Sequence, residues 1–117
     1  LAEAAIQIAE KLKIRAIVVI TRNGRGAGYL SNLRPREIGL YSFTNNSKVF
    51  SSMTLYRSVY PFLMEFRKNP EDTIQKALGI LKVKEGYATE EQVVVLANIL
   101  TGEGYCTTLQ IRTIPAV

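Results

Sequence analysis

The sequence predicts an α/β fold, a three-layer α/β/α sandwich whose five-stranded sheet is mostly parallel with the last strand antiparallel. Helical patterns alternate with apolar segments along the chain, and the segments 14–20 and 93–97 are nearly unbroken apolar runs. Such runs are typical of central strands that are buried on both faces. The chain has 117 residues, of which 47% are hydrophobic and 21% charged, a size and composition that suit one globular domain.

The first part of the chain predicts a helix, a buried strand and a second helix. Residues 1–13 are predicted as an amphipathic helix, followed by a strand at 15–20. The apolar positions of the first helix recur at helical spacing: Ala2, Ala5, Ile6, Ala9 and Leu12. A short second helix begins after a turn at 21–26. It must end by Arg34, because Pro35 disfavours helical geometry in the residue before it.

The middle of the chain predicts a strand, a helix and an edge strand. The strand at 38–43 places alternate residues on opposite faces of the sheet. The residues Thr44–Ser47 are typical of a turn and an N-cap, so a helix should begin there. A further strand is predicted at 59–66. It contains Pro61, which cannot donate a hydrogen bond to a neighbouring strand, so this strand should lie at the edge of the sheet.

The last third of the chain predicts a well-defined helix and a hairpin. Asn69–Asp72 combines an N-cap, a proline at the first helical position and two carboxylates at the positive end of the helix, which Gly86 should terminate. Strands at 93–97 and 107–114 are joined by a short loop and must be antiparallel, because a parallel return needs a long crossover. Right-handed crossovers with helices on both faces place the strand at 15–20 in the centre.

The turn after that central strand is the candidate phosphate site. Glycines let backbone N–H groups approach an oxyanion, and the helix that follows adds its positive end. Ligands of open parallel sheets lie beyond the carboxyl ends of the strands, where this turn lies. The segment is not a Walker sequence, so the alternative is a plain strand-to-helix turn with solvated arginines. The candidate phosphate-binding residues are Thr21, Arg22, Asn23, Gly24, Arg25 and Gly26.

A second candidate element is the loop Gly102, Glu103 and Gly104. Because the strand at 15–20 is central, this loop should lie beside the Thr21–Gly26 turn, so that two glycine-bearing loops face one crevice. One interpretation is a lid that closes over a ligand. The other is a hairpin connection that uses glycine for geometric reasons.

The composition excludes several kinds of chemistry. The chain has no histidine, which excludes histidine acid–base catalysis, histidine metal sites and histidine-dependent triads within it. We find no catalytic constellation and no metal site: Glu71 and Asp72 are explained by the helix start, and Cys106 lacks a base and should be semi-buried. The net charge of +5 is not gathered into a stripe with aromatics. A mildly basic surface or an anionic small ligand therefore explains it better than nucleic acid does.

The expected compartment is the cytoplasm. The sequence shows no signal peptide, no apolar run near the roughly 20 residues of a membrane span, and a single cysteine, which fits a reducing environment. The chain begins at Leu1 inside a helical pattern and without a methionine. We therefore expect residues 1–117 to be a single domain within a longer polypeptide.

Several segments, in chain order, resemble the carboxyl-terminal domain of pyruvate kinase. Residues 4–35 contain a helix, an apolar strand, a Thr-x-x-Gly-Arg turn, a short helix and an Arg-Pro pair. Further matches are Thr44-Asn45, the segment LYRSVYP at 55–61, and a valine-rich strand that leads to a Gly-x-Gly loop and a threonine-rich last strand. The resemblance spans essentially the whole chain.

The resemblance implies a five-stranded domain that binds sugar-phosphate or nucleotide effectors and forms part of a homotetramer interface. The enzyme transfers a phosphoryl group from phosphoenolpyruvate to ADP in glycolysis. Its catalytic barrel, which carries the substrate, magnesium and potassium sites, is a separate domain, so this chain alone should be inactive. Matched by position, Thr21, Asn23 and Gly26 correspond to the effector-phosphate turn, and Gly102–Gly104 to the loop that folds over a bound effector.

The chain departs from the family pattern at the effector site. Members activated by fructose 1,6-bisphosphate commonly carry serines at the positions of Asn23 and Gly26, and use an arginine and often a tryptophan near the fourth helix for the second phosphate. This chain has no tryptophan, and Arg67 is the only arginine between Phe66 and Thr89. These departures favour a monophosphate effector or none.

Two alternatives to a regulatory domain of pyruvate kinase stay open. One is a stand-alone phospholigand-binding module of the same fold, and the other is a purely structural assembly domain. For assembly, the candidate contacts are the alanine-rich first helix and the exposed last strand, because an uncovered sheet edge invites pairing.

Overall fold

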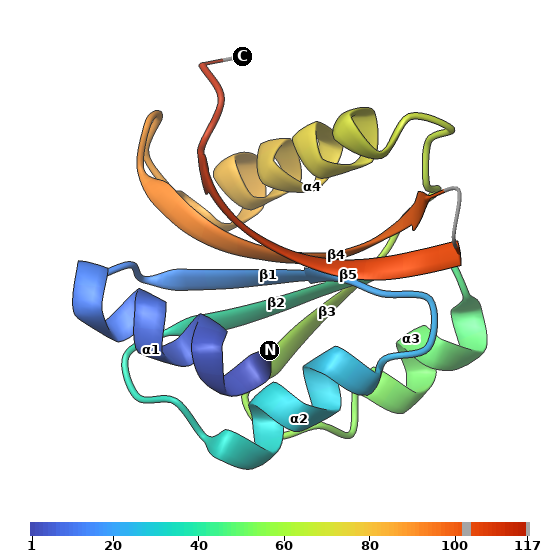
Figure 1. Cartoon of the computed structure of the whole chain (residues 1–117), viewed down its shortest axis with the longest axis horizontal. Coiled ribbons are helices and arrows are strands. Elements are labelled where there is room, and N and C mark those ends of the chain that lie inside the picture. The colour runs from blue at the N-terminus through green and yellow to red at the C-terminus, as the bar shows by residue number, and fades with distance from the viewer. Residues whose placement is uncertain (102–103, 117) are drawn as a thin grey trace.

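The computed structural model describes residues 1–101 and 104–116, which form four helices and five strands in the predicted order (Figure 1). Helices α1, α2 and α3 cover one face of the sheet and α4 covers the other (Figure 1), so the three-layer prediction is confirmed. The elements are α1 Ala2–Leu12, β1 Ala16–Ile20, α2 Arg25–Leu33, β2 Gly39–Thr44, α3 Ser47–Met53, β3 Val59–Leu63, α4 Pro70–Glu85, β4 Gln92–Thr101 and β5 Gly104–Thr113.

The strands lie in the order β3-β2-β1-β4-β5. Strand β1 is central and all five of its residues are buried, as its apolar run predicts. Pro61 lies in β3, at one edge of the sheet, and β4 and β5 pair antiparallel; both predictions are confirmed. The two hairpin strands are longer than predicted, because the ladder continues to the pair Thr101–Gly104, beyond the apolar residues on which the prediction rested.

The sheet separates two apolar cores. One lies under α4 and includes Tyr41 and Phe43, and the other lies under α1–α3 and includes Leu40, as the alternation in 38–43 predicts. Helix α4 begins as expected, with Asn69 Oδ1 accepting a hydrogen bond from the Glu71 N–H at 3.0 Å. It ends at Gly86, whose φ is 77°.

A cluster of polar and aromatic side chains lies at the end of the sheet where β1 and β4 begin. Arg15 donates to the Glu91 carboxylate at 2.7 and 2.9 Å and lies 4.9 Å from the centre of the Tyr87 ring. The Tyr41 and Tyr87 hydroxyl oxygens are 2.8 Å apart. Burial, with the Tyr87 hydrogen bond, raises the pKa of Tyr41, while the Arg15 hydrogen bonds lower the pKa of Glu91. The cluster joins the starts of β1 and β4 to the end of α4, and its role is therefore structural.

Candidate functional site

The Thr21–Gly26 turn is held in shape by its own side chains. The Thr21 N–H donates to the Phe43 carbonyl at 2.9 Å, which ties the turn to β2. The Thr21 hydroxyl oxygen accepts from the N–H groups of Gly24 at 2.9 Å and Asn23 at 3.3 Å. Asn23 Oδ1 accepts from the Arg25 N–H at 2.9 Å. Three of the amides that could meet a phosphate are therefore already hydrogen-bonded within the turn.

At both glycines of the turn, close packing explains why the residue has no side chain. Gly24 has a φ of 80°, and a Cβ there would lie 3.3 Å from Val49 Cγ1 of α3. A Cβ at Gly26 would lie 3.3 Å from Val19 Cγ1. Among the described residues, the N–H groups of Gly26 and Ala27 have no hydrogen-bond acceptor. These two amides, at the positive end of α2, are the ones open to an anion.

Two cavities flank the turn at the carboxyl edge of the sheet, and both touch Ile20, Ala97 and Asn98. The first has a volume of about 400 Å³, and the second about 450 Å³. The first is lined by Leu1, Ala2, Val19, Ile20, Thr21, Asn23, Arg25, Gly26, Tyr29, Leu96, Ala97, Asn98 and Thr107. The second is lined by Ile20, Arg22, Asn45, Phe66, Arg67, Lys68, Pro70, Thr73, Ile74, Ala97 and Asn98.

The six candidate residues of the turn therefore do not converge on one cavity. Thr21, Asn23, Arg25 and Gly26 line the first cavity, whereas Arg22 lines the second. Gly24 is buried and faces α3. The turn forms a ridge between the two cavities, with one arginine on each side.

The second cavity has a strongly basic lining. Arg22, Arg67 and Lys68 contribute three cations, and its described lining contains no carboxylate. The Arg22 guanidinium lies 5.3 Å from the centre of the Phe66 ring. The Arg67 N–H donates to the Thr73 hydroxyl oxygen at 2.8 Å, which fixes the loop before α4 to the first turns of that helix.

Sequence reasoning missed Lys68, Asn45, Thr73 and Asn98 as lining residues. One available signal was the Arg67-Lys68 pair directly before the N-cap of α4, since that segment follows the carboxyl end of β3. Of the others, Asn45 directly follows β2 at the same edge of the sheet, Asn98 lies within β4, and Thr73 lies in the first turn of α4.

The second candidate loop lies mostly outside the described residues. This applies to Gly102 and Glu103, while Gly104 begins β5. From β5, Thr107 lines the first cavity and its hydroxyl donates to Asn98 Oδ1 at 2.6 Å. Cys106 is exposed, so the expectation of a semi-buried thiol is wrong. The reason is that β5 is an edge strand with limited cover.

Within the described residues, no group of three or more His, Cys, Asp or Glu side chains could hold a metal ion. In the same part of the chain, no helix is both long and apolar enough to cross a membrane.

Comparison with known proteins identifies the family. The family model described as "Pyruvate kinase, alpha/beta domain" matches residues 1–112. Pyruvate kinase isozyme G, chloroplastic, of Ricinus communis is 36% identical over 82 residues, which cover 70% of this chain and 19% of that protein. Pyruvate kinase of Lactococcus lactis is 24% identical over 106 residues, 91% of this chain and 21% of that protein.

The fold is also that of a solved pyruvate kinase. The structure of Cryptosporidium parvum pyruvate kinase in complex with ADP superposes with a TM-score of 0.87 and 21% identity, covering 97% of this chain and 23% of that one. This chain thus spans about a fifth of the length of such relatives. Because the family model matches nearly the whole of this chain, the chain belongs to the family of pyruvate kinase carboxyl-terminal α/β domains.

Proposed function

We propose that this domain regulates a pyruvate kinase by binding a phosphorylated small molecule at the carboxyl edge of its sheet. The observation that carries the proposal is the convergence of Arg22, Arg67 and Lys68 on a cavity whose described lining has no carboxylate. Charges of one sign in a cleft focus the potential and attract an anion. The phosphate binds on the Arg22 side of the Thr21–Gly26 turn, and the rest of the ligand occupies the second cavity.

The ligand class is a sugar phosphate or a nucleotide. A volume of about 450 Å³ lies in the range of small-molecule sites, roughly 300–1,000 Å³. Arginine supplies paired N–H donors that match phosphate oxygens, and the positive end of α2 adds to the attraction.

The proposed role in the whole enzyme is a shift between two states of an oligomer, to which the ligand binds with different affinity. Phosphoryl transfer from phosphoenolpyruvate to ADP, with magnesium and potassium, takes place in the catalytic barrel of the same enzyme, and this domain supplies no catalytic residue. The proposed compartment is the cytoplasm, although the Ricinus communis relative is named as chloroplastic. If the reading frame upstream of Leu1 encodes a catalytic barrel, the alternative of a stand-alone phospholigand-binding module is excluded.

A thermal-shift screen tests the binding site. The compounds are fructose 1,6-bisphosphate, glucose 6-phosphate, ribose 5-phosphate, AMP and inorganic phosphate. A ligand at 100 times its dissociation constant should stabilise the folded chain by about 2.7 kcal/mol, which is about 10 °C for a domain of this size. Arg22→Met and Arg67→Met should each abolish most of this shift. Arg36→Met removes the same charge from an exposed position before β2 and should leave the shift unchanged.

Two outcomes would contradict the proposal. If no compound raises the unfolding temperature, the assembly-only alternative takes its place. If a compound acts equally on the wild type and on Arg22→Met, but not on Arg25→Met, the ligand occupies the first cavity instead.

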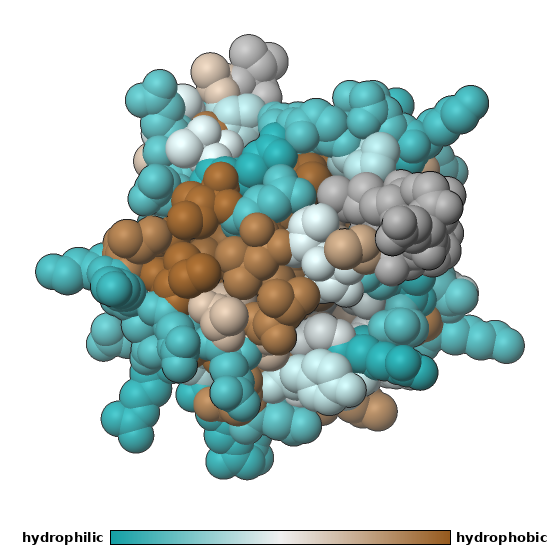
Figure 2. Space-filling view, viewed as in Figure 1, coloured by the Kyte–Doolittle hydropathy of each residue, from teal (hydrophilic) through white to brown (hydrophobic). Residues whose placement is uncertain are grey.

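We also propose that α1 and β5 form a contact with a second copy of this chain. Strand β5 is an edge strand with β4 as its neighbour in the sheet, and a long unprotected edge is a template for pairing. Figure 2 shows apolar surface on the side of the molecule where α1 and β5 lie. Apolar residues of these elements that keep some exposure include Ala2, Ile6, Ile8, Leu12, Leu109 and Ile111.

Sedimentation velocity tests this contact. Ile111→Lys places a charge in the proposed interface, at a side chain that is 43% exposed, and should weaken self-association about tenfold or more, because a desolvated unpaired charge is costly. Val83→Lys is the control: Val83 of α4 is 83% exposed and its replacement should change nothing. Equal association of both variants and the wild type would exclude this face.

A further inference from the structure

The turn before α2 contains an asparagine followed by a glycine, Asn23 and Gly24. The Asn23 side chain folds back over the next peptide group, because its Oδ1 accepts the N–H of Arg25, two residues further on, at 2.9 Å. This places the carboxamide carbon, Cγ, over the intervening Gly24 nitrogen. The Asn23 side chain is exposed, so water reaches it. A backbone nucleophile and a side-chain carbonyl are therefore held together in this turn.

The Thr21 hydroxyl connects the two groups. Its oxygen accepts the Gly24 N–H at 2.9 Å, and its proton is donated to Asn23 Oδ1 at 3.3 Å. Thr21 is only 5% exposed, and these bonds fix the direction of its hydroxyl. One hydroxyl can therefore take up the proton that the nitrogen loses and supply the proton that the oxygen gains, which is the task of a general acid–base group.

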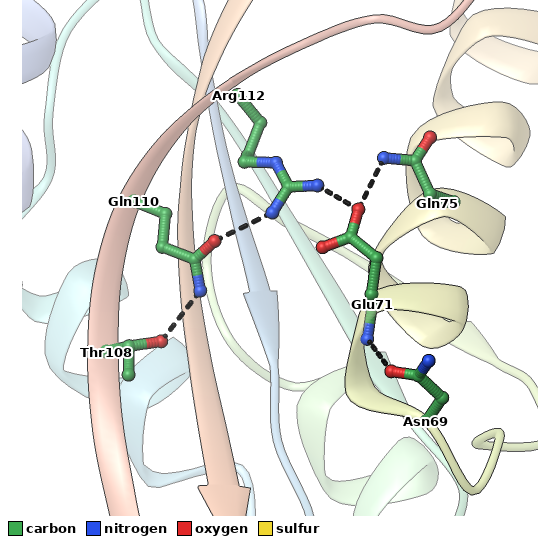
Figure 3. A network of polar contacts seen from close by, with 6 residues as sticks. All are labelled: Asn69, Glu71, Gln75, Thr108, Gln110 and Arg112. Carbon is green, nitrogen blue, oxygen red and sulfur yellow. Dashed lines mark hydrogen bonds and ion pairs between the residues drawn. The ribbon is translucent and has the colours of Figure 1, made fainter.

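Two other asparagines fold back in the same way, and the residue after each one makes the difference. Asn69 Oδ1 accepts the N–H two residues further on at 3.0 Å (Figure 3), but Pro70 follows it and has no N–H. Asn46 Oδ1 accepts the corresponding N–H at 2.9 Å, but Ser47 follows it, and its side chain crowds the nitrogen. Asn23 is the one asparagine of the sequence that is followed by glycine, which has no Cβ.

We propose that Asn23 is a site of spontaneous deamidation, in which Gly24 supplies the nucleophile and Thr21 carries the proton. The Gly24 nitrogen bonds to Asn23 Cγ, its proton passes to Thr21 Oγ1, and the Thr21 hydroxyl proton passes to Asn23 Oδ1. The tetrahedral carbon then re-forms its carbonyl, the bond to the carboxamide nitrogen breaks, and ammonia leaves with the proton from Oδ1. Water opens the resulting five-membered imide at either carbonyl, which leaves aspartate or isoaspartate.

The product changes the charge of the turn. Arg22 and Arg25 are its only charged residues, so the net charge of residues 21–26 falls from +2 to +1. An aspartate keeps the acceptor for the Arg25 N–H and adds a negative charge at the positive end of α2, which is a favourable position. It also places a carboxylate in the lining of the first cavity, where Asn23 lies. Deamidation therefore preserves the fold and weakens the attraction of the turn for anions.

Time-resolved mass spectrometry of the folded 117-residue chain at neutral pH tests the proposal. Conversion of carboxamide to carboxylate should occur at Asn23, while Asn46 and Asn69 stay unchanged over the same period. The chain unfolded in guanidinium chloride is the reference, because an asparagine–glycine pair also reacts in a flexible chain. Folding should speed the reaction at Asn23 by about tenfold or more, since it orients the nucleophile and positions the proton carrier.

Two variants separate proton transfer by Thr21 from a purely structural role. Thr21→Val keeps the shape of the side chain without the hydroxyl and should slow deamidation of the folded chain by about tenfold. Thr21→Ser keeps the hydroxyl and should react like the wild type, and all three unfolded chains should react equally. A purely structural role has the opposite sign, because a loosened turn reacts faster.

The proposal is wrong if folding slows the reaction at Asn23, or if folded Thr21→Val reacts as fast as the wild type or faster. Circular dichroism checks that each variant is folded. Should Thr21→Val not fold, the comparison of folded and unfolded wild type still decides. No ligand is present in any of these measurements, so their outcome is independent of the proposed function.

Discussion

Replacing Gly24 with valine should lower the free energy of unfolding by about 3 kcal/mol or more. Gly24 has a φ of 80°, a left-handed conformation that is especially unfavourable for a β-branched residue. Its Cβ would also lie 3.3 Å from Val49 Cγ1 and 3.4 Å from Met53 Cγ, so α3 must shift. Urea unfolding measures this loss of stability. In the same variant, the turn that separates the two cavities should be distorted.

Gly79→Ala is the matched control for this experiment. Gly79 lies inside α4, and a Cβ there would meet nothing within 4 Å. Alanine should therefore stabilise the chain by about 0.5–1 kcal/mol, because glycine loses more backbone entropy in a helix. If Gly24→Val were as stable as the wild type, the left-handed turn against α3 would be wrong.

Replacing Phe43 with alanine should cost about 3–5 kcal/mol. The Phe43 side chain is fully buried under α4, and its ring is stacked on that of Phe62 at a centroid distance of 4.8 Å. The cavity left behind lies next to the site, because the Phe43 carbonyl accepts the hydrogen bond from the Thr21 N–H. Chemical denaturation should show the loss as a lower midpoint with an unchanged slope.

Phe62→Ala removes the other ring of the same stack and serves as the comparison. Phe62 belongs to the edge strand β3 and is only partly buried, so less apolar surface is lost and water can fill the space. The expected cost is about 1–2 kcal/mol. Similar losses for both variants would mean that the stack, and not burial of Phe43, determines the stability.

Elements with local signals could be predicted from the sequence. The start of α4 follows from Asn69 and Pro70, because an N-cap and a first-turn proline act on amides within the same turn. The edge position of β3 follows from Pro61, which lacks a donor. The central place of β1 follows from its apolar run, because a strand that is apolar at every position needs cover on both faces.

The candidate site could be predicted only in part. The sequence indicated the carboxyl edge of the sheet and the Thr21–Gly26 turn, because the glycines and the strand before them are local features. It did not indicate that Arg22 and Arg25 line different cavities. Thr21 and Asn23, the neighbours of Arg22, line the other cavity, so the division follows from the path of the backbone through the turn.

By itself, the sequence determined the order of the elements, the central strand, the edge strand, the antiparallel hairpin and the location of the turn, because each depends on residues that are near neighbours or on a simple periodicity. Only the tertiary structure decided the rest. The meeting of Arg22 with Arg67 and Lys68 and of Arg112 with Glu71 joins segments that lie 41 to 46 residues apart in the sequence. Such meetings depend on strand register and on which face of the sheet α4 covers, and no local pattern determines either.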